Sequence, residues 1–492
     1  MSERRVTAFV GVLVVAGIAL RGWILGSDLG ALDSDEAVWG VMARHMLDGE
    51  VTAFYWGQGY GGTQETLLTA GLFALVGPSV TALRVVPLAL FALAAVLTWR
   101  VGIRTVGEPY ARLAAGIVWV WPAYVAWKST RAHGFYGAGL VLGLLVALLA
   151  LRLSERRDRR DAFALGLALG LGWWATPQVV LLAVPALGWL VWRRRDTLAH
   201  MWLIGIAALL SALPWVTANA THDWYSLGFG PGGGTAVDRL HNLAVATLPM
   251  ALGMRTPFTL DWVGGAAIGA TLYVVALAGL TGAVVRGRRR LGPLLVALVF
   301  LPVFYALSSY ASLQTEPRYL VLLGPAFALL GATAVRASRA ATALACVLAA
   351  LSAVGVASLQ RSGAPVARAE GVPVPADIHP LLNVLERADV RYAYADYWIA
   401  WRIVFESGER IIAVTSGSNR YERRGNRVIP VHGELGRYPP FYRRVAASAD
   451  PAYIFLAGGN RERGLRPLLL EAGYVTRRVE GFVVYARRPA AS

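Results

Sequence analysis

Three carboxylates, Asp33, Asp35 and Glu36, follow the first long apolar segment of the chain, residues 9–25. Charges at a point where a chain leaves a membrane are costly unless they are paired or used, so this group is a candidate functional site. A carboxylate in such a place can take the proton of a hydroxyl group that attacks an electrophile. The alternative is a solvated loop in which Asp35 caps a helix that starts near Ala37.

A second candidate is the run of aromatic residues and glycines over 54–62, which contains Gln58 and Tyr60. Aromatic faces beside hydrogen-bonding groups suit sugar rings, and glycines let the backbone approach a ligand closely. The alternative is an interfacial belt of aromatic side chains with a flexible loop. Between the two candidates, a set of residues recurs at helical spacing, which predicts an amphipathic helix lying on the membrane surface. These residues are Val38, Val41, Met42, His45 and Met46.

Cationic side chains border later apolar segments. Lys128 is the single lysine in a chain whose lysines and arginines together number 47. A compact ammonium group kept at a membrane boundary could serve to bind phosphate, whereas a chance lysine would simply snorkel to the interface. Arg318 and Arg131 are the other cations that we consider for phosphate, because a guanidinium group pairs with two phosphate oxygens at once.

The remaining candidates each have a structural alternative. Arg84 could contact phosphate or cap the outer end of its helix, and we favour the cap. His133 could be a base or a metal ligand, but such a histidine is more often an interfacial hydrogen-bonding group. Tyr319 fits an aromatic belt better than a site. Glu65 could act in a site or could be a first-turn carboxylate favoured by the helix dipole.

The composition is that of a polytopic membrane protein. Apolar residues make up 56% of the chain and come in long blocks, and charged residues make up 16%. The net charge of +17 does not indicate a nucleic-acid partner, because the arginines fall in short loops, where the positive-inside rule places them. The single cysteine, Cys346, excludes an intrachain disulfide framework. The arginine clusters are Arg4-Arg5, 100–112, 152–160, 193–195, 286–290, and Arg336 with Arg339.

The sequence predicts an all-α membrane domain over residues 1–360, with about eleven transmembrane helices. Eleven crossings put the N-terminus and every arginine cluster in the cytoplasm and the C-terminus outside. The apolar stretch 64–77 is too short for a span, so we expect residues 34–78 to hold outer juxtamembrane helices. The expected spans are 6–25, 83–103, 113–127, 135–152, 162–176, 178–192, 200–217, 263–285, 292–310, 319–335 and 341–359.

The composition changes after the last expected span. Residues 361–376 are rich in proline, glycine and alanine and predict a linker. Residues 377–492 have the periodicities of a small α/β domain, which we expect outside the cytoplasm. The expected helices are 379–389 and 461–472, and the expected strands are 391–396, 410–415, 452–457 and 482–486.

Several short motifs together resemble the GT-C glycosyltransferases, and within them the branch of protein O-mannosyltransferases and aminoarabinose-to-lipid A transferases. The resemblance covers roughly residues 5–335. A further motif, Ala395-Asp396-Tyr397-Trp398, resembles the extracytoplasmic C-terminal domains of some bacterial members. The membrane-domain motifs are Asp35-Glu36 after the first span, Gly77-Pro78-Ser79 with Leu83-Arg84, and Glu316-Pro317-Arg318-Tyr319-Leu320.

The resemblance implies an inverting enzyme that moves a single sugar, mannose being one candidate, from a polyprenyl-phosphate carrier. The acceptor would be the hydroxyl group of an extracytoplasmic glycan, lipid or protein, and the carrier would lie in the lipid bilayer. No nucleic acid takes part. The alternative is a non-catalytic membrane protein that binds or flips the same carrier. A secondary transporter is disfavoured, because the chain shows no matched halves with interrupted helices.

The resemblance also implies roles for individual residues. Asp35 is the general base, with Glu36 orienting it or the acceptor, and Glu65 matches a place where the family carries a polar or acidic site residue. The charge of the leaving phosphate has to be held, for which Arg318 is the first candidate and Arg131 the second. The pattern requires no cofactor and is compatible with a divalent metal ion.

One departure from the family bears on the phosphate site. Relatives commonly carry an acidic residue just after the arginine of the second outer loop, whereas Ala132 follows Arg131 in this chain. A second carboxylate would then have to come from Glu36 or Glu65, or the site would work with one.

Overall fold

The computed structural model describes most of the chain. Parts of two predicted arginine clusters, residues 288–290 and Arg336, lie outside the described residues. The chain divides into two compact units, each built from several segments: unit 1 comprises 1–29, 59–65 and 84–365, and unit 2 comprises 30–58, 66–83 and 366–492. The described residues are 3–228, 234–287, 292–308, 315–334, 338–416, 421–424, 427–431 and 436–487.

Helices form at every predicted apolar segment. Short turns join them, namely η1 (Asp28–Gly30), η2 (Pro177–Val179), η3 (Arg195–His200), η4 (Tyr225–Leu227), α12 (Ala236–Asn242), the π-helix η5 (Leu243–Thr247), α13 (Leu248–Ala251) and η7 (Arg318–Leu323). The main helices are α1 (Glu3–Leu25), α4 (Val80–Thr105), α5 (Glu108–Val120), α6 (Ala123–Lys128), α7 (Tyr136–Glu155), α8 (Arg159–Ala175), α9 (Val180–Arg193), α10 (Met201–Ser211), α11 (Leu213–Ala220), α14 (Ala266–Gly287), α15 (Gly292–Leu307), α16 (Gly324–Ala334) and α17 (Ser338–Ser362).

The helix lengths are those of an integral, multi-pass membrane protein. Within the described residues, five helices are long and apolar enough to cross a membrane, namely α1, α4, α7, α14 and α17. A sixth candidate is the pair 195–211 and 213–220, which is bent by 61° at its break. The segments 177–193, 292–307 and 318–334 are shorter apolar helices. The helix over 64–76 is also short, as predicted for a segment that does not cross.

The loops that follow α7 and α9 lie together at one end of unit 1. Arg152 pairs with Asp161 at 2.7 Å, and Arg157 and Arg194 both pair with Asp196, at 2.7 and 3.0 Å. The two pairs made by Asp196 are partly exposed and contribute little stability, whereas Asp161 is buried. All three pairs show which loops lie together. Two of the predicted cytoplasmic arginine clusters therefore share one end of the helical unit, as the positive-inside pattern requires.

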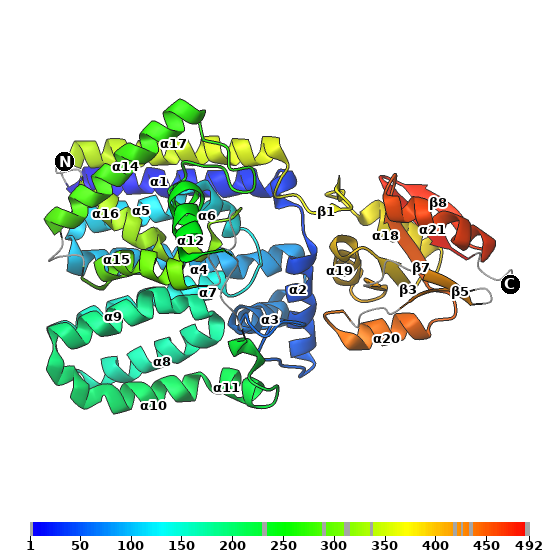
Figure 1. Cartoon of the computed structure of the whole chain (residues 1–492), viewed down its shortest axis with the longest axis horizontal. Helices are drawn as coiled ribbons and strands as arrows, with labels where there is room; N and C mark the ends of the chain where they lie inside the picture. The colour runs from blue at the N-terminus through cyan, green and yellow to red at the C-terminus, as the bar shows by residue number, and fades with distance from the viewer. Residues whose placement is uncertain are drawn as a thin grey trace. The chain divides into compact units, whose positions relative to one another are not determined.

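Helices α8 and α10 lie side by side in Figure 1 and pack backbone against backbone. A Cβ atom at Gly166 would come within 2.3 Å of the Ile204 carbonyl oxygen, and one at Gly170 within 2.0 Å of the Ala208 carbonyl oxygen. Small residues four positions apart are a common means of close helix packing in membranes. Both positions therefore require glycine.

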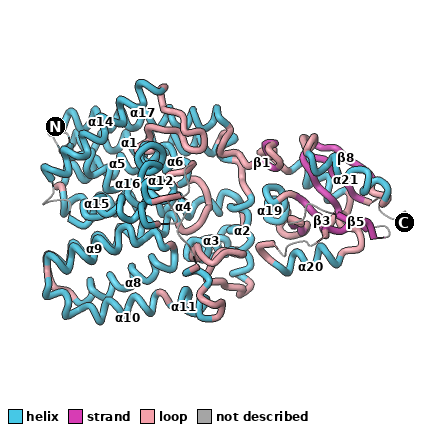
Figure 2. Tube along the Cα trace, in the orientation of Figure 1, coloured by secondary structure: helices cyan, strands magenta, loops and turns pink. Residues whose placement is uncertain are grey.

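Unit 2 contains a five-stranded mixed sheet with the strand order β4-β3-β7-β9-β8. Strand β3 runs parallel to β4 and β7, whereas β9 runs antiparallel to β7 and β8. Figure 2 shows that the strands of the described chain are confined to its C-terminal part. Their bounds are β1 (Arg368–Ala369), β2 (Val372–Pro373), β3 (Tyr392–Ala395), β4 (Ile412–Val414), β5 (Tyr421–Arg424), β6 (Arg427–Pro430), β7 (Ala452–Leu456), β8 (Val475–Val479) and β9 (Phe482–Ala486).

The helices of the C-terminal part confirm two predictions and add two elements. Helices α18 (His379–Arg387) and α21 (Asn460–Glu471) match the predicted ones, and β3, β4, β7 and β9 match the predicted strands. Helices α19 (Tyr397–Glu406) and α20 (Pro439–Ala447) and strand β8 were not predicted. The sequence therefore predicted the central strands of the sheet, but not every element around them.

Unit 2 also takes in two helices from the first hundred residues, α2 (Ser34–Leu47) and α3 (Gln64–Val76), the latter from its third residue. The apolar side of α2 packs on α19: Val38 and Val41 are fully buried, and a Cβ atom on Gly40 would lie 2.3 Å from the Phe405 ring. The prediction that this side of the helix lies on the membrane surface is wrong, because protein covers it.

The start of α2 differs from the structural alternative considered for the acidic group. The N-cap is Asp33, whose carboxylate accepts a hydrogen bond of 2.9 Å from the Glu36 backbone N–H. Asp35 lies inside the first turn, where a carboxylate is also favoured by the helix dipole. Asp33 therefore caps the helix, and the Asp35 side chain is not the capping group.

His45 ties α2 to two other parts of unit 2. Its Nδ1 lies 2.7 Å from Glu50 Oε2, and its Nε2 lies 3.0 Å from Glu409 Oε2. Burial alone would lower the pKa of His45, but the two carboxylates outweigh burial and raise it above its ordinary value. Since the folded state binds this proton more tightly, the contribution of His45 to stability is complete below the unfolded pKa and is lost as the pH rises through the folded pKa.

Replacing His45 with glutamine is therefore expected to lower the free energy of unfolding by about 1–3 kcal/mol at low pH, and by less at high pH. Thermal unfolding of the purified protein at about pH 5 and about pH 8 measures the difference. His379 is the matched control, because its pair with Asp377 is largely exposed and should contribute little at either pH. Equal losses for His45→Gln at both pH values would contradict the prediction.

Candidate functional site

Asp35 lies among three donors that all reach the same carboxylate oxygen. The hydroxyl group of Tyr397 donates a short hydrogen bond to Oδ1, and Tyr55 Oη and Arg437 Nη2 each lie 3.4 Å from it. Within the described residues, Oδ2 accepts no hydrogen bond, and 39% of the Asp35 side chain is exposed. One oxygen is thus held in place by three donors, and the side chain as a whole remains partly exposed.

The charge states of these neighbours suit that arrangement. Burial, followed by the nearby Asp35 carboxylate, raises the pKa of both Tyr55 and Tyr397, so both remain protonated donors at neutral pH. Burial alone would lower the pKa of Arg437, but the two tyrosines and Asp35 raise it. Asp35 therefore has a positively charged partner, Arg437.

The glycine-rich loop positions Arg437. The guanidinium carbon lies 4.7 Å from the Tyr55 ring centre and 5.1 Å from that of Tyr397. Gly57 has a φ of +70°, and a Cβ atom there would lie 3.0 Å from Arg437 Cα. The Arg437 Nη1 group also lies 3.4 Å from the Trp56 carbonyl oxygen. This loop, which is predicted to contact a sugar, also contacts Arg437, an arginine that was not among the predicted site residues.

Glu36 and Gln58 also fall in unit 2, with different surroundings. The Glu36 side chain is fully buried on α2, so it can orient neighbouring groups but does not face solvent. Gln58 follows Gly57, and its backbone N–H donates a hydrogen bond of 3.1 Å to the Tyr55 carbonyl oxygen. Gln58 therefore closes the turn that carries Tyr55.

A second polar cluster lies in unit 1, around the start of α7. Glu65 Oε1 accepts a hydrogen bond of 2.8 Å from the Ala138 backbone N–H, and the backbone of Gly137 also donates to this carboxylate. The side chain is only 5% exposed. Glu65 thus acts as a cap for a helix distant in sequence, in addition to lying in the first turn of its own helix.

Burial raises the pKa of Glu65 to about 7, although the two backbone donors and the positive charge of Lys128 act in the opposite direction. A carboxyl group that titrates near neutral pH can give or take a proton under physiological conditions. The raised pKa also has a stability consequence. The folded state holds the proton more tightly than the unfolded state, so stability is present below the usual pKa of 4.5 and falls as the pH rises to about 7.

Replacing Glu65 with glutamine removes this titration but keeps an oxygen that can accept from Ala138. The variant is expected to gain stability relative to the parent protein as the pH rises from 4.5 to about 7, by up to about 3 kcal/mol. Melting temperatures of both proteins in detergent across this pH range measure the effect. A stability difference that is independent of pH would show that Glu65 is ionised throughout.

Lys128 and His133 lie next to Glu65. The Lys128 Nζ is 2.7 Å from His133 Nδ1 and 4.5 Å from the centre of the Tyr136 ring, and Lys128 is 5% exposed. A buried ammonium group held by a histidine and an aromatic face is not a snorkelling side chain. Of the two alternatives considered for Lys128, the structure therefore disfavours the snorkelling one.

Arg318 joins the same cluster from η7. Its guanidinium group is within hydrogen-bonding reach of the Tyr136 and Tyr319 hydroxyl groups and lies 5.4 Å from the Tyr319 ring centre. Its Nε is buried and has no hydrogen-bond partner among the described residues. Glu316, two residues earlier, accepts a hydrogen bond of 2.7 Å from the Tyr124 hydroxyl group. The buried Nε–H group of Arg318 is therefore available to donate a hydrogen bond to an oxyanion.

The other predicted cations and Tyr60 have less central positions. Arg131 Nη1 donates to the Leu29 carbonyl oxygen at 3.2 Å, a contact that holds the turn after α1. Arg84 is buried on the second turn of α4. The Tyr60 ring lies edge-on to Phe135 at 6.4 Å. Within unit 1 the structure therefore brings together five predicted residues, namely Glu65, Lys128, His133, Arg318 and Tyr319.

Three residues that contact the predicted site residues were not themselves predicted. Tyr136 connects Lys128 with Arg318, and Tyr397 and Arg437 hold Asp35. The motif that contains Tyr397 was noticed only as a resemblance, and nothing local marks Arg437, which is 402 residues from Asp35. Among the described residues, no group of three or more His, Cys, Asp or Glu side chains is arranged to hold a metal ion.

Comparison with known proteins gives one family and several solved structures. Residues 66–235 match the family model described as dolichyl-phosphate-mannose-protein mannosyltransferase. No curated protein sequence matches the chain. The structure is similar to that of ArnT from Cupriavidus metallidurans bound to undecaprenyl phosphate, with a TM-score of 0.66 and 14% identity over 99% of this chain and 98% of ArnT.

The oligosaccharyltransferase AglB from Archaeoglobus fulgidus, in complex with an inhibitory peptide and a dolichol-phosphate, is also similar. Its TM-score is 0.50, with 13% identity over 98% of this chain and 74% of AglB. At such low identity, these likenesses show a shared fold.

Proposed function

We propose that this membrane protein, which has the GT-C glycosyltransferase fold, transfers a single sugar from a polyprenyl-phosphate carrier to an acceptor hydroxyl group. The observation that carries the proposal is the Asp35 carboxylate, with Oδ1 held by three donors and Oδ2 free of described partners. An oriented carboxylate with one oxygen available is what a general base requires. Mannose is our first candidate for the sugar, in keeping with the name of the matching family.

In the proposed reaction, Asp35 Oδ2 takes the proton of the acceptor hydroxyl group. The oxygen then attacks the anomeric carbon from the face opposite the carrier, and the bond between that carbon and the phosphate oxygen breaks. The anomeric configuration is therefore inverted. Tyr397 and Arg437 keep the carboxylate in place until the proton arrives. Glu36, being buried, acts as a positioning residue.

The charge that develops on the leaving phosphate needs cationic and hydrogen-bonding partners. We assign Arg318 to this role because its buried Nε has no described partner. Lys128 would supply a second positive charge, with His133 and Tyr136 holding it in place. Glu65, whose pKa is near 7, would adjust the charge of this cluster. Arg131 and Arg84 serve structural roles in this proposal.

The proposal includes an orientation. The N-terminus and the arginine clusters would face the cytoplasm, and the C-terminal α/β part would lie outside, where sugars arrive on lipid carriers. The matched solved structures support a lipid carrier for the donor, because one holds undecaprenyl phosphate and another a dolichol-phosphate.

Transfer by the purified protein in nanodiscs tests the proposal directly. The donor is polyprenyl-phosphate mannose with a radiolabelled sugar, and the acceptors are envelope glycans, lipids and proteins supplied as separate fractions. Label should move to one acceptor fraction, or be released to water when no acceptor is present. Saturable carrier binding without transfer or release would instead support a non-catalytic protein that binds or flips the carrier.

A further inference from the structure

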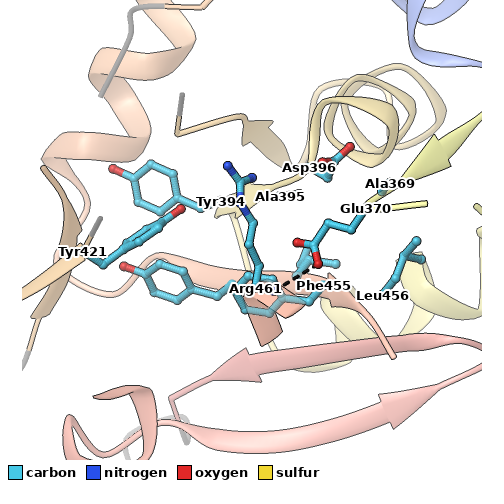
Figure 3. Close-up of a pocket in the computed structure, with 11 residues that line it drawn as sticks. Ala369, Glu370, Tyr394, Ala395, Asp396, Tyr421, Phe455, Leu456 and Arg461 are labelled. Atoms are coloured by element: carbon cyan, nitrogen blue, oxygen red, sulfur yellow. Dashed lines mark hydrogen bonds between the residues drawn. The ribbon is translucent and has the colours of Figure 1, made fainter. Parts of the chain in front are cut away.

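The hollows of the described structure differ in size and in chemistry. The recess beyond β3 and β7 in unit 2 has room for only about one or two water molecules, because the rings of Tyr394 and Tyr453 stack against each other there (Figure 3). Two larger hollows lie in unit 1. The one between α14, α16 and α17 is lined by apolar side chains, so nothing in its chemistry selects an occupant. The other lies between α1, α4 and α5 and has an arginine at one end.

The groove between α1 and α4 has small residues of α5, namely Ala115 and Gly116, along its floor. Its empty volume, including the open side, is about 840 Å³, which is within the range of small-molecule sites. Val14 and Val96 form its rims and are 42% and 49% exposed. Because α1 and α4 are long and apolar enough to cross a membrane, the open side of the groove faces lipid.

Three helices meet at one end of this groove. Arg112 is the last lining residue of α5 at that end, and its Nη1 group donates a hydrogen bond of 2.8 Å to Thr7 Oγ1 on α1. Its Nε group donates to Glu108 Oε1 at 2.6 Å, and Trp99 Nε1 on α4 donates to the same oxygen at 3.2 Å. The start of α1, the last turns of α4 and the start of α5 are therefore held together here.

Two further arginines continue the helix faces that line the groove toward this end. Arg4 lies three residues before Thr7 on α1, and Arg100 lies four residues after Val96 on α4. Residues three or four apart share one face of a helix. Both arginines are exposed, and neither has a carboxylate partner among the side chains that the structure describes. Since Glu108 balances Arg112, the positive charge at this end comes from Arg4 and Arg100.

This end of the groove is far from the Arg318 cluster. Arg104 Nε, in the last turn of α4, lies 3.5 Å from Glu155 Oε1 at the end of α7. Arg318, in contrast, contacts Tyr136 at the start of α7. Helix α7 has 20 residues, so its two ends are about 30 Å apart, which is the thickness of the hydrocarbon core of a bilayer. The groove arginines and Arg318 therefore serve opposite faces of the membrane.

We propose that this groove binds one anionic glycerophospholipid. An acyl chain lies over Ala115 and Gly116, and the phosphate accepts hydrogen bonds from Arg4 and Arg100 at the end of the groove. Basic side chains beside membrane helices attract anionic headgroups, and a guanidinium group can pair with two phosphate oxygens. Trp99 lies where an indole ring is favoured, at the level of the headgroup. The site does not depend on sugar transfer, and in the proposed orientation its lipid comes from the cytoplasmic leaflet.

Native mass spectrometry of the full-length protein in detergent tests the inference. Dioleoyl phosphatidylglycerol, which is anionic, and dioleoyl phosphatidylcholine, which has the same chains and no net charge, are titrated separately. One phosphatidylglycerol molecule should bind with a Kd at least about tenfold lower than that of phosphatidylcholine. Arg4→Ala and Arg100→Ala should each raise the Kd of phosphatidylglycerol about fivefold, the usual contribution of one arginine at an anionic surface.

The controls separate this site from general attraction to lipid. Arg160→Ala removes an exposed arginine at the start of α8, outside the groove, and should bind phosphatidylglycerol like the parent protein. Ala95→Leu fills the groove and should weaken both lipids alike, whereas Ala267→Leu, on the exposed start of α14, should weaken neither. Because Arg4 and Arg100 are exposed, their replacement should leave the melting temperature unchanged.

Several results would overturn the inference. They are equal affinity for the two lipids in the parent protein, parental affinity for phosphatidylglycerol in the double variant Arg4→Ala/Arg100→Ala or in Ala95→Leu, and an equal loss in Arg160→Ala.

Arg318→Ala separates this inference from the proposed function. The variant should keep its phosphatidylglycerol while its binding of polyprenyl phosphate is weakened. Loss of phosphatidylglycerol in Arg318→Ala would make the groove part of the carrier site and would refute this inference. Absence of sugar transfer, with selective phosphatidylglycerol binding intact, would refute the proposed function alone.

Discussion

Replacing Asp35 with asparagine is expected to lower kcat/KM for sugar transfer by a factor of about 10²–10⁴. Asparagine has the same shape and can accept from Tyr397 and Arg437 through its side-chain oxygen, but it cannot take the acceptor proton. The loss should therefore appear in kcat rather than in carrier binding. Initial rates with labelled polyprenyl-phosphate sugar at several donor concentrations separate the two parameters.

Asp33→Asn is the matched control for this experiment. Asp33 belongs to the same acidic group but caps α2, and asparagine is an equally good N-cap. The control should keep its melting temperature and its transfer rate. If Asp35→Asn transferred sugar at the parental rate, Asp35 would have no place in the mechanism. If both variants lost activity equally, the acidic loop as a whole would be implicated, and the assignment to Asp35 would fail.

The second large effect is expected at Arg318. Removing the guanidinium group in Arg318→Ala should weaken binding of the carrier phosphate by at least about 2 kcal/mol, or about thirtyfold in Kd. Arg318→Lys keeps the charge but loses the planar pair of donors, so it should have an intermediate affinity. Titration of polyprenyl phosphate, without sugar, into each variant in nanodiscs gives the Kd directly.

Arg112→Ala is the control for a lost arginine in the same helical unit. Arg112 pairs with Glu108 at 2.6 Å and contacts Thr7 near the start of α1, away from the Arg318 cluster. Its removal should leave the Kd for polyprenyl phosphate unchanged. Parental affinity in Arg318→Ala would move the phosphate site elsewhere, and Lys128 would then be the next residue to replace.

The membrane helices could be predicted from the sequence because their cause is local. A run of apolar residues forms a helix in a membrane wherever it occurs, since its backbone has no other hydrogen-bond partners there. The resemblance inferred from short motifs such as Asp35-Glu36 and Glu316-Pro317-Arg318 agrees with the fold shared with ArnT and with the family model that matches residues 66–235. The central strands β3, β7 and β9 were also predictable, because strands buried on both faces read as continuous apolar runs.

The partners of the acidic group could not be predicted, for a physical reason. Tyr397 and Arg437 reach Asp35 across 362 and 402 residues of chain, and their own local sequence shows only a helix start and a loop. The burial of the apolar side of α2 was missed for the same reason. Its spacing fits a membrane surface and a protein surface equally well, and only the position of α19 decides between them.

Unit 2 is built from segments that are far apart in the sequence, and this has a consequence for biosynthesis. Residues 30–58 emerge from the ribosome long before the α19 side chains that cover α2, which belong to residues 397–406. Until α19 has been made, α2 lacks the helix that packs against it. The acidic loop can take its final form only after residues as distant as Arg437 have been synthesised and have folded around it.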